Sequence, residues 1–196
     1  MTAAPPRRIR LTKQDRRAQL LAEATLQIAH SGYQGFTMDG LAKASRLTHA
    51  GVLHHFASKK ELLVEVLRHR DELDAAAALP DSAIPSDPAG LRAVLDALVE
   101  RNFRQPEIVR LYTVLSAEAL NPEHPAHEYF RDRLQQIRRL IAGSLALPPG
   151  IADDFAVDYL SFMDGLQLNW LRDPTIDFLG RWRDFADGLL ARVDRG

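Results

Sequence analysis

The sequence predicts an all-α protein of about nine helices, with a three-helix N-terminal domain over residues 1–57 and a C-terminal helical domain over residues 58–196. Apolar residues recur with helical spacing along almost the whole chain. Cap residues, prolines and glycines separate these apolar segments. Alternation with a period of two, which would indicate strands, is absent.

The first helix is predicted to begin after Thr12, because Thr12 and Asp15 have the spacing of a capping box. Gly32 is expected to end it, since glycine readily takes the left-handed conformation that closes many helices. The apolar side of this helix consists of Leu20, Leu21, Ala24, Ile28 and Ala29.

Two short helices and one long helix follow. Thr37 can cap a helix that ends near Ala44, and Thr48 can cap a second that ends at His54 or His55. Ser58 and Glu61 form a second capping box, which opens a long helix. The residues expected to pack inward in this region are Leu41, Ala42, Leu47, Val52 and Phe56.

The segment from Leu79 to Pro88 is rich in proline and reads as a linker. Asp87-Pro88 then starts the next helix, as a cap residue followed by proline at the first helical position. The remaining predicted helices span about 88–104, 106–120, 125–146, 151–172 and 176–193.

The helix predicted at 151–172 is apolar on two nearly opposite sides, whereas a surface helix needs only one apolar side. We therefore expect one side to form a four-helix contact with a second copy of the chain around a twofold axis. The alternative is that both sides are buried within one subunit. The candidate interface residues are Val157, Leu160, Leu168 and Leu171, with Trp182, Phe185 and Leu189 from the last helix.

The composition excludes several classes of protein. The chain has no cysteine, which excludes disulfide scaffolds and thiol catalysis and fits a cytoplasmic location. No run of apolar residues is long enough to span a membrane, and the start, MTAAPPRRIR, lacks the apolar stretch of a signal peptide.

Charge is distributed unevenly along the chain. Residues 1–70 carry 12 Lys and Arg against 5 Asp and Glu, although the whole chain has a net charge of −1. A basic N-terminal segment on an acidic body favours a polyanion as the partner of that segment. An uneven but merely solvated surface is the alternative.

The second and third predicted helices have the spacing of a helix-turn-helix, in which the second helix enters the DNA major groove. Small residues there let the helix backbone approach DNA closely, and threonine or histidine can donate to phosphates or base edges. The outward residues are Thr48, His49, Ala50, Gly51 and His54, and Lys59 lies in the first turn of the following helix.

Two other uses of the histidines, a catalytic pair and a metal site, are less favoured. Adjacent His54 and His55 point in different directions on a helix, so we expect His55 to be partly buried and His54 to contact DNA. His124 and His127 could share a helical face with Glu128, but their spacing is not that of a known zinc motif. We expect neither a metal nor a cofactor.

The run "TMDGLAKASRLTHAGVLHHFASKKEL", residues 37–62, resembles the DNA-binding signature of the TetR family of bacterial transcriptional repressors. The segment "DGLQLNWLRDP" at 164–174 also resembles part of the family's C-terminal domain. The residues that match the signature or replace it conservatively are Thr37, Leu41, Ala42, Leu47, Thr48, Val52, His55, Phe56, Ser58 and Lys59.

Three residues depart from the family pattern. Arg46 stands where the family usually has the glycine of the turn, so it must adopt a conformation that glycine adopts more easily, and it could add a phosphate contact. Leu53 and Ala50 replace a usual tyrosine and glycine, which changes the phosphate contacts. Together with Thr37, Arg46 completes the candidate DNA-binding residues.

The resemblance implies a dimeric repressor that binds a double-stranded operator and is released by a small-molecule effector held in the C-terminal domain. The alternative is an all-α small-molecule-binding protein or enzyme whose helix-turn-helix is only architectural. The candidate ligand-binding residues are Phe103, Tyr112, Glu118, Phe130, Tyr159, Phe162 and Asn169.

Overall fold

The computed structural model describes residues 12–79, 85, 87–145 and 149–193, and all regular structure within these ranges is helical. Residues 1–11, the start of the basic N-terminal segment, and most of the predicted linker lie outside the described residues. The helices are α1 (Lys13–Gly35), α2 (Met38–Ala44), α3 (His49–Leu53), α4 (Lys59–Ala78), α5 (Pro88–Phe103), α6 (Pro106–Glu118), α7 (His127–Leu145), α8 (Pro149–Arg172) and α9 (Phe178–Val193).

The predicted helix starts are confirmed by the cap hydrogen bonds. Thr12 and Asp15 form the capping box of α1, and Thr37, Thr48, Ser58 and Asp87 each accept a backbone N–H in the first turn of their helices. Each cap satisfies one of the donors that a helix start leaves unpaired. These short-range contacts explain why the helix starts follow the sequence so closely. The predicted end of α1 at Gly32 is wrong, because the chain is kinked at Gly32 and the helix continues to Gly35.

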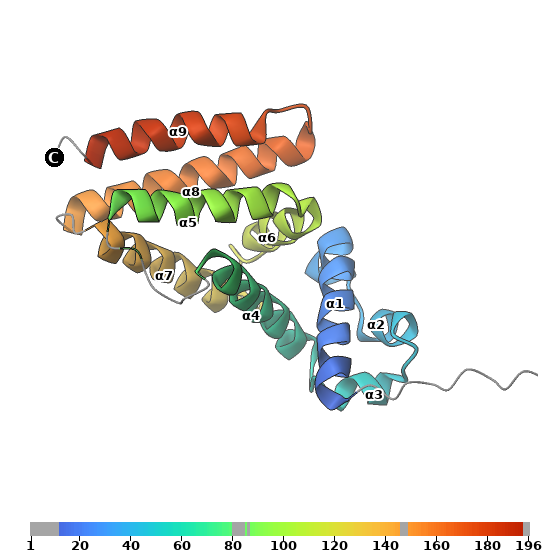
Figure 1. The fold of residues 1–196 in the computed structure, drawn as a ribbon. Helices are drawn as coiled ribbons and strands as arrows, with labels where there is room; N and C mark the ends of the chain where they lie inside the picture. The colour runs from blue at the N-terminus through green and yellow to red at the C-terminus, as the bar shows by residue number, and fades with distance from the viewer. Residues whose placement is uncertain (1–11, 80–84, 86, 146–148, 194–196) are drawn as a thin grey trace, which may run out of the picture.

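Two groups of helices make up the molecule (Figure 1). The short helices α2 and α3 pack beside α1 at one end, and α8 and α9 run antiparallel at the other end. The long helix α4 leads from the first group to the second, and α6 lies against α1. The position of α3 therefore depends on how α1, α4 and α6 are held together.

The apolar core is divided in a way that crosses the predicted domain boundary. One cluster joins the apolar faces of α1–α4 to Leu111 and Leu115 of α6, and to Ala119 and Ala126 beyond it. The other cluster lies among α5, α8 and α9, with single residues from α6 and α7. All of the predicted inward residues of the N-terminal unit are buried or partly buried. None of the described helices is long and apolar enough to cross a membrane.

Candidate nucleic-acid interface

The turn between α2 and α3 is a Schellman motif in which Arg46 takes the place of glycine. The Leu47 N–H donates to the Ala42 carbonyl at 2.8 Å, and the Arg46 N–H donates to the Lys43 carbonyl at 3.2 Å. Arg46 has a φ of 55°, which is left-handed backbone, and its side chain is exposed. The expected glycine-like conformation is thus confirmed, and it places a guanidinium on the surface next to α3.

The short helix α3 is anchored by one buried side and exposes the other. Val52 has no exposed surface, whereas Thr48, His49, Ala50 and His54 are exposed and Gly51 is partly exposed. The Thr48 hydroxyl accepts the Gly51 N–H at 3.0 Å. A hydroxyl that accepts in a cap can still donate its own hydrogen to a phosphate oxygen. Thr37 has the same arrangement at the start of α2, where it accepts the Gly40 N–H.

His49 is held by a residue of α2. Its Nδ1 atom lies 2.5 Å from Oδ1 of Asp39, and both side chains are exposed. Since a carboxylate only accepts, Nδ1 carries the hydrogen and the Nε2 atom is left for an outside partner. This contact fixes the ring of His49 and ties the two helices of the turn together.

A surface groove runs between the start of α1 and α3. It is lined by Thr12, Lys13, Arg16, Leu47, Gly51, His54 and His55. Two cationic side chains of α1 thus lie beside the exposed residues of α3. Such an arrangement suits a polyanion backbone that passes along the groove.

His55 and Arg17 serve the packing beneath this surface. His55 is partly buried, as predicted, and burial, together with the charge of His54, lowers the pKa of its imidazole. The Arg17 guanidinium donates to the His55 carbonyl at 2.7 Å and to Glu65 Oε2 at 2.6 Å, and it stacks on Phe56. Sequence reasoning did not single out Arg17, because its partners are distant in the chain.

Unlike the other candidate DNA-binding residues, Lys59 has a side chain that points toward a neighbouring aromatic ring of α1. Its ammonium lies 4.4 Å from the centre of the Tyr33 ring, and the residue is only partly exposed. Burial lowers the pKa of Lys59. The structure therefore turns this lysine toward α1 instead of toward solvent.

The candidate ligand-binding residues lie in separate places. Tyr112 and Phe130 pack together beside α4, and Tyr159 is buried against Trp182. Phe103 packs on Trp170 and Phe178, and Phe162 stacks on Phe185. At the surface, Asn169 donates to the Gly165 carbonyl. Glu118 contacts the end of α1. Phe162 and Asn169 share a surface groove on α8.

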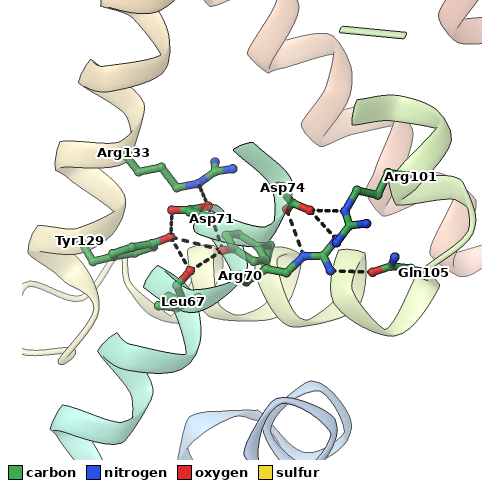
Figure 2. A network of polar contacts seen from close by, with 9 residues as sticks. Leu67, Arg70, Asp71, Asp74, Arg101, Gln105, Tyr129 and Arg133 are labelled. Atoms are coloured by element: carbon green, nitrogen blue, oxygen red, sulfur yellow. Dashed lines mark hydrogen bonds and ion pairs between the residues drawn. The ribbon is translucent and has the colours of Figure 1, made fainter. Parts of the chain in front are cut away.

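A polar network surrounds α4 where it enters the C-terminal helices (Figure 2). On one side Asp71 accepts from the Tyr112 and Tyr129 hydroxyls and from Nε of Arg133. Burial raises the pKa of both tyrosines, so they are neutral donors. On the other side Asp74 pairs with Arg70 and Arg101. Three helices, α5, α6 and α7, thus hold a single turn of α4 through charge-assisted hydrogen bonds.

The candidate dimer residues divide into surface and core. Val157 and Leu168 of α8 are exposed, and Leu160, Leu171 and Phe185 are partly exposed. Trp182 and Leu189 of α9 are buried inside the subunit, and the Trp182 ring N–H donates to Asp96 of α5. Burial alone therefore leaves the first five available to a partner.

The histidines considered as metal ligands face different groups. His124 packs against Tyr33, whereas Nδ1 of His127 lies 2.8 Å from the Ala119 carbonyl at the end of α6. Among the described residues no group of three or more His, Asp or Glu side chains has the arrangement of a metal site.

Comparison with known proteins agrees with the geometry of the turn. Residues 20–66 match the family described as bacterial regulatory proteins, tetR family. The HTH-type transcriptional regulator BetI of Burkholderia thailandensis is 30% identical over 166 residues, which cover 80% of this chain and 80% of the relative. The BetI regulator of Paraburkholderia phymatum is 30% identical over 193 residues, covering 90% of this chain and 94% of the relative.

Solved structures show the same fold. A transcriptional regulator from Rhodococcus sp. Rha1 has a TM-score of 0.76 at 23% identity, over 94% of this chain and 97% of the other. A TetR-family regulator from Streptomyces coelicolor has a TM-score of 0.75 at 20% identity, over 93% and 96%. The relatives are regulators, so the alternative of an enzyme with an architectural helix-turn-helix is set aside. The chain belongs to the TetR family of bacterial regulatory proteins and is a DNA-binding transcriptional regulator, not an enzyme.

Proposed function

We propose that the protein is a cytoplasmic homodimer that represses transcription by binding a double-stranded operator and is released from it by a small molecule. The proposal depends on one observation: α3 exposes small and hydrogen-bonding residues, while Val52 on its other side is fully buried. The groove with Lys13 and Arg16 extends this surface toward the DNA backbone. In this proposal α3 contacts the bases, and the neighbouring groove contacts the phosphates.

The residues proposed to touch DNA have distinct roles. Ala50 and Gly51 allow close approach to the groove floor, and His49 and His54 present ring nitrogens to base edges or phosphates. The exposed guanidinium of Arg46 is placed for a phosphate. Thr37 and Thr48 can donate their hydroxyl hydrogens to phosphates from the starts of α2 and α3. Lys59 can join them only by leaving the Tyr33 ring.

The proposed dimer forms through α8 and α9. Val157 is 43% exposed and Leu168 is 37% exposed, although both lie on a helix whose opposite side is already buried. Neighbouring exposed apolar side chains of this kind are typical of an interface. Leu160, Leu171 and Phe185 extend it, and Trp182 and Leu189 support it from within. A twofold dimer places two α3 helices on one face of DNA, about 34–36 Å apart.

The proposed effector acts on α4. Tyr112 and Phe130 lie where α4, α6 and α7 meet, and Tyr112 donates to Asp71 and to the Leu67 carbonyl of α4. A ligand that takes over the Tyr112 hydroxyl or the Arg133 guanidinium would release α4 and change the separation of the two α3 helices. A regulator from Saccharomonospora viridis with a TM-score of 0.67 was solved in complex with choline, which supports a small organic ligand for this fold.

The test is DNA binding across a salt series, using a labelled duplex from the region upstream of the protein's own gene. We expect the logarithm of the affinity to fall with that of the salt concentration by about 0.9 per phosphate contact, and Arg46→Gly to reduce this slope by about one contact. Glycine suits a φ of 55°, so this change removes the charge without straining the turn.

His54→Ala should weaken binding about tenfold by removing an exposed donor of α3. The matched control is His69→Ala, which removes a surface histidine of α4 that lies outside the groove. Equal affinity of the His54 variant and the wild type, or a salt slope near zero, would contradict the proposed interface.

A further inference from the structure

The helix α6 ends against the junction between the DNA-binding unit and the rest of the molecule. Its last residue is Glu118, which the sequence suggested as a ligand-binding residue. The side chain of Glu118 is partly buried and lies against the end of α1 and the loop after α6, and its charge acts on Lys59 at the start of α4. One carboxylate therefore faces all three segments that meet behind the helix-turn-helix.

The contact with α1 depends on a kink. Gly32 has φ 67° and ψ 177° inside α1, which is not helical, and it frees the N–H of the next residue from the helical pattern. The Tyr33 N–H donates to Oε2 of Glu118 at 3.1 Å, across 85 residues of sequence. A Cβ atom on Gly32 would lie 2.6 Å from Oε1 of Glu118. The backbone angle thus favours glycine, and a larger residue at this position would also displace the carboxylate.

The link with α4 runs through Tyr33. Lys59 is the first residue of α4, and its ammonium is stacked over Tyr33, the same residue whose N–H bonds Glu118. Burial lowers the pKa of Lys59, and the negative charge of Glu118 opposes that effect. The carboxylate therefore supplies a counter-charge for a lysine that is partly removed from water.

His124, in the loop after α6, lies beside both Tyr33 and Glu118. Its ring packs edge-on against Tyr33 with ring centres 5.1 Å apart, and its Nδ1 accepts the Ala126 N–H at 3.2 Å. The hydrogen of the neutral ring is then on Nε2, which lies 3.6 Å from Oε2 of Glu118, too far for a normal hydrogen bond. No described residue satisfies this buried atom. The carboxylate is therefore held toward Tyr33 rather than toward the imidazole.

We propose that Glu118 is a positioning residue for operator binding: by accepting the N–H of Tyr33 opposite Lys59, it fixes the end of α1 and the start of α4 to α6 and so sets the direction of α3. The inference rests on the proposed function, because it assumes that the spacing of two α3 helices decides the affinity. Small shifts at the base of α1 and α4 are carried to α3 through their shared core.

The test compares Glu118→Ala and Glu118→Gln with the wild type, using the full-length protein and the labelled duplex from upstream of its own gene. Binding is measured well below the unfolding temperature, and amide hydrogen exchange of the peptide containing Tyr33 is followed by mass spectrometry. Glu107→Ala is the matched control, because Glu107 is an exposed glutamate at the other end of α6.

We expect Glu118→Ala to weaken DNA binding about tenfold and to speed amide exchange at the kink, because the acceptor of the Tyr33 N–H is lost. Glutamine keeps an oxygen that can accept the Tyr33 N–H but loses the charge opposite Lys59, so Glu118→Gln should recover most of the binding, to within about threefold of the wild type. A merely structural role would lower thermal stability without this rescue.

Three outcomes would overturn the inference: a Glu118→Ala variant that binds as the wild type does, a loss of affinity with unchanged exchange at Tyr33, or a glutamine variant as weak as the alanine variant. A wild-type protein that fails to bind the duplex would instead contradict the proposed function, and this inference with it.

Discussion

The two ends of the molecule both have well-buried cores, but they expose different kinds of side chain. Around α3 the exposed side chains are polar, cationic or very small except for Leu53, and Val52 and Phe56 beneath them are fully buried. On α8 the exposed side chains include Val157 and Leu168. A surface of the first kind suits a polyanion, and a surface of the second kind suits another protein chain. The comparison predicts that the two surfaces depend on each other, since dimerisation through one doubles the DNA contacts of the other.

The largest expected effect comes from placing a charge on the exposed apolar surface of α8. Leu168→Glu should make the protein monomeric in light-scattering measurements and reduce DNA affinity by about 100-fold or more, because the second half-site is no longer held at a high effective concentration. Leu134→Glu is the control, since Leu134 is a similarly exposed leucine on α7. A dimer that persists in Leu168→Glu would refute the proposed role of this surface.

A smaller effect is expected in the core that joins α6 to the DNA-binding unit. Leu115 is fully buried among residues of α1–α4. Leu115→Ala should lower the free energy of unfolding by about 2–5 kcal/mol in urea denaturation, through lost burial and the cavity that remains. The control is Leu73→Ala on the exposed side of α4. A cost below about 1 kcal/mol would mean that α6 contributes little to this core.

The smallest effect concerns the dependence of stability on pH. Burial lowers the pKa of His124 below its ordinary value near 6.5, although Glu118 partly opposes this. As the pH falls below 6.5, His124 therefore takes up a proton more readily in the unfolded chain than in the folded chain. The free energy of unfolding decreases until the pH falls below the pKa of His124 in the folded state. The measurement is thermal unfolding between pH 7.5 and pH 5, with these limits spanning roughly the range in which histidine titrates.

His124→Asn should lose less stability than the wild type over this range, because asparagine can still accept the Ala126 N–H but does not titrate. Burial also lowers the pKa of His55, so part of the slope will remain. The control is His69→Asn on the surface of α4. An unchanged slope in His124→Asn would show that this buried imidazole does not govern the acid sensitivity.

Much of the fold was predictable because its borders depend on short-range contacts. Thr12, Thr37, Thr48 and Ser58 cap their helices through residues three positions away, and such pairs are visible in the sequence. The left-handed conformation of Arg46 was predicted from the family resemblance, because the family usually has the glycine of the turn at this position. The outward set of α3 followed from helical periodicity.

The roles of Arg17 and Lys59 were not predictable, because both depend on distant partners. Arg17 meets Glu65 from another helix, and Lys59 turns to Tyr33 although its position in the family signature suggested DNA. The aromatic residues chosen for a ligand site come from four different helices. Only the packing of α5–α9 decides which of them meet: Tyr112 packs against Phe130, whereas Phe103, Tyr159 and Phe162 pack against other aromatic rings.

Sequence alone therefore set the helices, their caps and the residues that α3 presents, since each of these depends on groups within about one turn of one another. Tertiary structure decided which carboxylate meets the kink of α1, which residues surround α4, and which apolar residues of α8 and α9 are left outside the subunit. The physical reason is that a hydrogen bond across 85 residues, such as that between Tyr33 and Glu118, depends on the packing of whole helices and leaves no local pattern in the chain.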